Sequence, residues 1–187
     1  RRRLVTTIAA DADLAPEREA DPTLEGVELF LGVGVLGLVT FLVVLDITIV
    51  NVILSAVASS YGSAPHEVTM GITVFAAAQA VVMPLTGWLS QRFGIVRTFL
   101  LSLAGFGVTS LFCGMAPTLS AFLVARILQG LTAGPMLPLV QTLLQRCVPK
   151  AKLPVAFAFW TIMLSMGPLA GPALGGIKAD TIGWPWA

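Results

Sequence analysis

The sequence predicts an all-α membrane protein, a polytopic bundle of about five transmembrane helices. Of its 187 residues, 56% are hydrophobic and only 11% are charged, less than half the charged share of a typical soluble domain. The mean hydropathy is +0.89. The apolar residues are gathered into runs of about 20 residues or more, the length that crosses the hydrocarbon core of a bilayer. A soluble fold could not bury so much apolar surface.

The composition also limits the chemistry. A net charge of +1 gives no electrostatic basis for binding nucleic acid. One histidine and two cysteines leave little material for a catalytic triad, a metal site or a disulfide framework. We therefore expect no enzymatic activity, no metal and no cofactor, and we interpret His66 as a polar loop residue.

The two ends of the chain differ from its middle. Residues 1–26 are acidic and poor in aromatic residues, a composition typical of a disordered or loosely helical tail. The chain begins at Arg1 without a methionine and stops at Ala187 directly after an apolar segment, so we expect a fragment of a longer protein. The first apolar run is too long for a signal peptide and is expected to remain as a membrane anchor.

Five spans are expected along residues 27–187, each bounded by a recognisable turn. The turns are a polar segment at 59–67, a short basic segment at 91–94, a hairpin at 116–118 and a basic loop at 145–152. The spans themselves are predicted at 28–54, 68–90, 97–116, 119–143 and 153–177.

The distribution of basic residues predicts the orientation, because cytoplasmic loops collect Lys and Arg. Nine of the eleven basic residues fall in the tail and in or beside the second and fourth turns, while the first and third turns have none. The tail is therefore predicted to be cytoplasmic, and Cys113 and Cys147 to lie near opposite sides and not to pair. The exceptions are Arg126, inside a span, and Lys178, just after the last one.

Asp46 and Arg126 are the two charged residues well inside the predicted spans, away from their ends. A charge at membrane depth is costly and usually faces a bundle interior or a wet cavity. Counted from the outer ends of their spans, the two lie at depths of roughly 12 and 9 Å, so they share a level. One interpretation is a proton-titrating carboxylate beside a cation that modulates it. The alternative is a static ion pair that holds two helices together.

The first span also carries a polar stripe. Thr40, Thr48, Asn51 and Ser55 fall within about 80° of one another on a helical wheel, and Asp46 falls on the other side. An ideal helix therefore cannot direct Asp46 and this stripe into one cavity. Either the helix is distorted, or one face meets helices and the other meets substrate.

Small residues and prolines shape the fourth and fifth spans. Gly130 and Gly134 are four residues apart and predict close helix packing, whereas Pro135 and Pro138 predict a bend. The end of the fifth span has a glycine stripe at spacing four together with prolines that each remove a backbone donor, which favours a shaped or hinged segment. Its residues are Gly167, Pro168, Gly171, Pro172, Gly175 and Gly176.

Four stretches of the sequence together resemble the major facilitator superfamily, and within it the drug:proton antiporters of the EmrB/QacA type. They are LDITIVNV at 45–52, GWLSQRFG at 87–94, RILQG at 126–130 and GPLAGPALGG at 167–176. They match, in order, that group's first-helix motif, the loop between helices two and three, the fourth-helix motif and the fifth-helix antiporter motif. The loop departs from the family pattern at Gln91, Ile95 and Val96, where the family has charged residues, so its charge network is weaker here.

The resemblance implies the first five helices of the superfamily's N-terminal half, in a bacterial cytoplasmic membrane protein. It implies export of hydrophobic, often cationic compounds in exchange for protons, in some relatives with a periplasmic adaptor and an outer-membrane channel. Alternatives are a dedicated metabolite exporter and a non-transporting membrane scaffold or sensor. The implied site residues are Asp46 and Arg126 for proton coupling, Thr48, Asn51 and Gln129 for a substrate cavity, and Gly87, Arg92 and Gly94 for the loop motif.

Overall fold

The computed structural model describes residues 26–181, apart from the side-chain surroundings of residues 53–56, 65 and 173–181. The predicted tail therefore lies outside the described residues, except for Gly26. The described part is helical without a strand, and it has five passes long and apolar enough to cross a membrane. The predicted all-α class and the five spans are thus confirmed.

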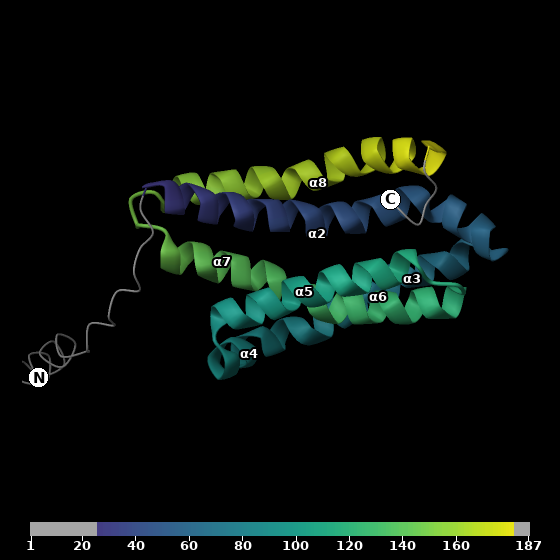
Figure 1. Cartoon of the computed structure of the whole chain (residues 1–187), viewed down its shortest axis with the longest axis horizontal. Coiled ribbons are helices and arrows are strands. Elements are labelled where there is room, and N and C mark those ends of the chain that lie inside the picture. The colour runs from purple at the N-terminus through teal and green to yellow at the C-terminus, as the bar shows by residue number, and fades with distance from the viewer. Residues whose placement is uncertain (1–25, 182–187) are drawn as a thin grey trace, which may run out of the picture.

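The first and last passes are the long helices α2 (Gly26–Tyr61) and α8 (Leu153–Thr181). They lie side by side along their length (Figure 1). Both exceed the expected spans, 28–54 and 153–177, by several residues. α2 continues as helix through residues 55–61, and α8 continues through residues 178–181.

The second and fourth passes are each interrupted, where single helices were expected. The second consists of α3 (Pro65–Val82), a short 3-10 segment η1 (Met83–Leu85) and α4 (Thr86–Phe93). The fourth consists of α6 (Leu119–Ala133) and α7 (Met136–Cys147). Proline cannot donate to the helical ladder, and the interruptions contain Pro84 and Pro135. The predicted bend therefore falls at Pro135, whereas Pro138 lies in the first turn of α7, where the missing donor has little effect.

The third pass, α5 (Ile95–Gly114), is joined to its neighbours by two tight turns. Gly94 has φ +86°, a conformation that L side chains rarely adopt, which explains why glycine ends α4. The Thr98 hydroxyl then donates to the Gly94 carbonyl at 2.8 Å. At the other end, the Thr118 hydroxyl accepts from the Ala121 N–H at 3.2 Å and caps α6.

The interior and the surface have the character of a protein in lipid. Met136, Leu139 and Val140 of α7 are almost fully buried, while large apolar side chains such as Phe30 (79% exposed) and Leu169 (77% exposed) cover the outside. Exposed apolar surface on this scale marks contact with a membrane or with protein. α6 is packed between α3 and α5, and it therefore carries its side chains into the middle of the bundle.

Candidate functional site

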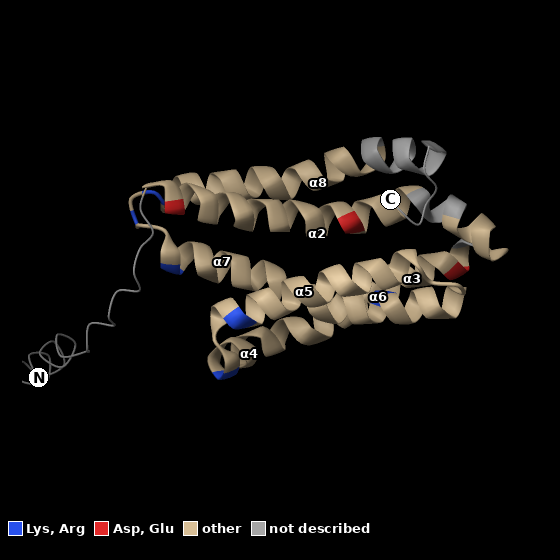
Figure 2. Cartoon of the chain, in the orientation of Figure 1, with Lys and Arg blue, Asp and Glu red and all other residues tan. Residues whose placement is uncertain are grey.

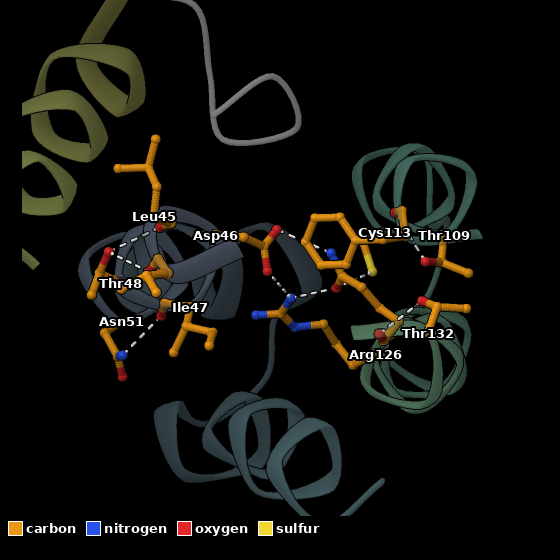
Figure 3. A network of polar contacts seen from close by, with 12 residues as sticks. Leu45, Asp46, Ile47, Thr48, Asn51, Thr109, Cys113, Arg126 and Thr132 are labelled. Atoms are coloured by element: carbon orange, nitrogen blue, oxygen red, sulfur yellow. Dashed lines mark hydrogen bonds and ion pairs between the residues drawn. The ribbon is translucent and has the colours of Figure 1, made fainter. Parts of the chain in front are cut away.

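The predicted intramembrane charges meet. Arg126 of α6 and Asp46 of α2, 80 residues apart in the sequence, form an ion pair with an Nη1–Oδ2 distance of 2.9 Å. Figure 3 shows the Asp46 carboxylate directed from α2 toward the guanidinium of Arg126. The two residues predicted to share a membrane level are therefore in direct contact.

Gln129 completes the site. Residues 126 and 129 lie on one face of α6, because positions three apart in a helix are neighbours. The Gln129 Nε2 donates to Asp46 Oδ1 at 3.0 Å, and its Oε1 accepts from Arg126 Nη1. Each carboxylate oxygen of Asp46 thus has its own donor from α6, an arrangement that stabilises the ionised carboxylate.

The burial of the site is uneven. The Gln129 residue is 0% exposed and the Arg126 side chain 2%, but the Asp46 side chain is 19% exposed. The cation is thus enclosed by protein, whereas its carboxylate partner keeps one accessible edge. Within the described part of the chain, that edge of Asp46 is the part of the site left uncovered.

Aromatic rings enclose the guanidinium of Arg126. It lies 5.0 Å from the ring centroid of Phe75 on α3 and 5.9 Å from that of Phe122 on α6, distances at which a cation is attracted to a ring face. The Arg126 Nε is buried and has no hydrogen-bond partner within the described part of the chain. The cation is thus stabilised mainly on its Nη1 side, by Asp46 and Gln129.

Cys113 of α5 extends the network on the far side from α2. Its Sγ donates to Gln129 Oε1 at 3.4 Å, and Figure 3 shows the thiol beside the site. Nothing in the sequence distinguishes Cys113, Phe75 or Phe122, because isolated cysteines and phenylalanines in apolar helices are ordinary core residues. Only the packing of α3, α5 and α6 identifies them.

The polar stripe of α2 faces elsewhere. Thr48 donates to the Gly167 carbonyl of α8 at 3.2 Å and points away from Asp46 in Figure 3. Thr40 accepts from Trp160 Nε1 of α8 at 2.9 Å, while Asn51 is exposed and donates to Ile47 O. Opposite faces of α2 therefore meet α8 and α6. A substrate role for Thr48, Asn51 or Gln129 stays a prediction, and the surroundings of Ser55 are not described.

The predicted glycine faces make close helix contacts. A Cβ placed on Gly130 would meet the Phe75 carbonyl of α3, and one on Gly134 would lie 2.9 Å from the Gln79 carbonyl. Gly167 and Gly171 of α8 face Val44 and Thr48 of α2 in the same way. α8 remains one helix through Pro168 and Pro172, so the predicted hinge is not visible as a break. Gly175 and Gly176 belong to α8, in the part whose surroundings are not described.

The loop-motif residues lie at the end of the bundle that carries most of the described basic residues. Gly94 forms the turn between α4 and α5 with positive φ. Gly87 is exposed, and a Cβ added to it would have nothing within 4 Å. Arg92 is exposed as well. Figure 2 shows that the charged residues of α4, α5 and α7 gather at this end, away from the ion pair.

Comparisons with known proteins agree with this architecture. The family model of the Major Facilitator Superfamily matches residues 36–187. The chain is 43% identical over 165 residues to the "Multidrug export protein EmrB" of Haemophilus influenzae, and 41% identical over 163 residues to that of Escherichia coli strain K12. It is also 43% identical over 165 residues to the "Fatty acid resistance protein FarB" of Neisseria gonorrhoeae. These alignments cover 87–88% of the chain but only 32% of each relative, so the chain spans about a third of their length.

Proposed function

Because the chain belongs to the Major Facilitator Superfamily, we propose that it is the N-terminal part of a transporter that exports hydrophobic, often cationic compounds in exchange for protons. The observation that carries the proposal is the Asp46 carboxylate, which is held by Arg126 and Gln129 yet keeps an accessible edge. A titratable group inside a membrane, with a named partner, is the usual mark of a proton or ion pathway.

The geometry supports a competition between proton and substrate. Arg126 and Gln129 together stabilise ionised Asp46. A cationic compound near the accessible edge favours the same ionised form and so expels a proton. A proton on Asp46 removes that attraction and weakens the hold on the compound. Each ligand then changes the affinity of the other by the same factor, as coupled exchange requires.

The wider assembly follows from the same proposal. The tail is cytoplasmic, the coupling ion is the proton, and the membrane is the bacterial cytoplasmic membrane, because the relatives are bacterial exporters. A periplasmic adaptor and an outer-membrane channel are proposed partners of the full-length protein. The rest of that protein supplies the other wall of the substrate cavity.

A second candidate is an exporter dedicated to amphipathic acids. It is favoured by the relative named for fatty acid resistance, which is as similar to this chain as the multidrug exporter of Haemophilus influenzae. Full-length protein in proteoliposomes separates the two candidates. Efflux of the lipophilic cation ethidium supports the multidrug function, whereas efflux of a long-chain fatty acid without ethidium efflux supports the dedicated one.

The decisive test of proton coupling is Asp46→Asn in the full-length transporter, with Glu28→Gln as the matched control at an exposed carboxylate. Asparagine preserves the shape of the side chain but cannot exchange a proton at neutral pH. We expect the variant to reach the membrane and bind substrate, but to lose substrate-triggered proton release. The measurement is substrate binding together with the pH change of a weakly buffered solution of purified protein.

Two outcomes contradict the proposal. Normal proton release from Asp46→Asn would place the coupling group elsewhere. Failure of the variant to accumulate in the membrane would favour a purely structural ion pair, because removing one partner leaves Arg126 buried and uncompensated.

A further inference from the structure

We propose that Cys113 is a positioning residue for the proton site, acting through Gln129. The inference rests on the proposed function, in which Asp46 takes up and releases a proton. It starts from the hydrogen bond of the Cys113 thiol to Gln129 Oε1 at 3.4 Å, within the buried interface of α5 and α6. The thiol does not contact substrate in this proposal. It determines which end of the Gln129 amide faces the carboxylate.

The amide of Gln129 has two orientations with opposite effects on Asp46. In the structure, Nε2 donates to Asp46 Oδ1 and Oε1 accepts from both Arg126 and Cys113. This orientation favours an ionised carboxylate, which only accepts hydrogen bonds. The reversed orientation would present Oε1 to Asp46. There Oε1 would accept a hydrogen bond from the O–H of the protonated carboxyl group and so favour the protonated acid.

Two donors hold the amide in the first orientation. Reversal would bring Nε2 against Arg126 Nη1, so that two donors face each other, and it would also leave the thiol proton without its acceptor. Arg126, however, is itself bound to Asp46. Its hydrogen bond to Gln129 is therefore expected to change when Asp46 is protonated. Cys113 belongs to a different helix and does not contact the carboxylate through any described hydrogen bond. It is therefore the donor that holds Gln129 independently of the state of Asp46.

The described groups around Asp46 leave few other causes of a pH effect. Arg126 from α6 is paired with Asp46, and Cys113 from α5 is joined to Gln129 by its hydrogen bond. The titratable residues of α3 are His66 and Glu67 in its first turn, and residues 153–172 of α8 have none. A change in proton affinity after a substitution at Cys113 is thus attributable to the Gln129 amide or to the thiol itself.

Removal of the thiol donor should ease proton uptake by Asp46. We expect Cys113→Ala and Cys113→Val to raise the pH at which half of Asp46 is protonated by about half a pH unit, the scale of one weak hydrogen bond. Cys113→Ser retains a hydroxyl donor and should stay near the wild-type midpoint. Valine fills the volume that alanine leaves empty, so agreement between these two variants separates the lost donor from a cavity. Cys147→Ala, at the end of α7, is the matched control.

The experiment uses purified full-length transporter without substrate. Infrared spectra recorded across a pH titration report protonated carboxylic acids, and the band that Asp46→Asn removes belongs to Asp46. The midpoint of that band is then measured for each Cys113 variant and for Cys147→Ala. The readout is independent of transport, and a merely structural role of Cys113 would not move it in the Ala and Val variants while leaving Ser unchanged.

The outcomes are distinguishable. A raised midpoint in Cys113→Ala and Cys113→Val, with wild-type behaviour of Cys113→Ser and Cys147→Ala, supports the positioning role. A titrating Asp46 band with the same midpoint in every variant overturns it and leaves the proposed function intact. The absence of any titrating band that depends on Asp46 overturns the proposed function and this inference together.

Discussion

At the scale of single residues, one guanidinium connects the site. Arg126 donates from Nη1 to both Asp46 and Gln129, while its Cζ lies over the ring of Phe75, 5.0 Å from the centroid. A lysine could supply the charge, but it lacks the planar guanidinium, which lies over a ring while one of its nitrogens donates to two acceptors. The choice of arginine is therefore explained by the ring together with the two acceptors.

Arg126→Lys should consequently impair coupling although it retains the charge. Loss of a hydrogen bond to a charged group corresponds to about a ten- to hundredfold effect, and we expect substrate-triggered proton release to fall by that range. The measurement is proton release from purified full-length protein, normalised to the amount in the membrane. Arg97→Lys, an exposed residue at the start of α5, is the control. Wild-type release from Arg126→Lys would show that only the charge matters.

Sequence reasoning reached part of this site. The pairing of Asp46 with Arg126 was predictable, because helix rise converts residue counts into membrane depth. Gln129 was identified only as a cavity residue, since its bond to Asp46 depends on the rotation of α2 and α6 about their axes. The place of Cys113 and Phe75 beside the ion pair is not predictable from the sequence, because an apolar run does not indicate which core residue faces a buried charge.

At the scale of helices, glycine determines how closely two backbones approach. Gly130 and Gly134 place α6 against the carbonyls of Phe75 and Gln79 on α3, and this contact positions Arg126. The glycine spacing predicted these faces directly, since small residues four apart form a groove. The breaks of the second and fourth passes were only partly predicted, because whether a proline bends or interrupts a helix depends on the neighbours that satisfy the freed carbonyls.

The α2–α8 contact makes a sharp prediction for Gly171. A Cβ at this position would lie 2.6 Å from the Thr48 Cβ and 3.3 Å from the Thr48 backbone carbon, so the clash cannot be relieved by side-chain rotation alone. Gly171→Leu should force α8 away from α2, at a cost of about 1–3 kcal/mol or more. We expect the full-length variant to insert into the membrane but to lose transport, measured as efflux normalised to membrane protein.

The matched control for Gly171 is Gly34→Leu on α2, where an added Cβ has nothing within 4 Å. It should transport like the wild type. Normal efflux from Gly171→Leu would mean that α8 tolerates separation from α2, and the tight contact would then have no functional role.

At the scale of the whole molecule, the basic residues are gathered at one end of the bundle. Apart from Arg126 and Lys178 of α8, the described basic residues lie at the end of the bundle formed by α4, the start of α5, the end of α7 and the loop before α8 (Figure 2). Clustering of basic residues in the second and fourth turns was evident in the sequence, and the fold brings those turns to one end. Lys and Arg are retained on the cytoplasmic side, so this end is predicted to face the cytoplasm.

Cysteine labelling of the full-length protein in intact cells tests that orientation. Both variants are made in a background carrying Cys113→Ser and Cys147→Ser. Ser63→Cys places a thiol in the turn between α2 and α3. Gln145→Cys places a thiol at an exposed position of α7, at the opposite end of the bundle. A membrane-impermeant maleimide should label Ser63→Cys in intact cells but label Gln145→Cys only after permeabilisation. The permeabilised sample shows that both thiols can react. The reverse pattern would invert the protein, place the basic end outside, and require protons to reach Asp46 from the other side of the membrane.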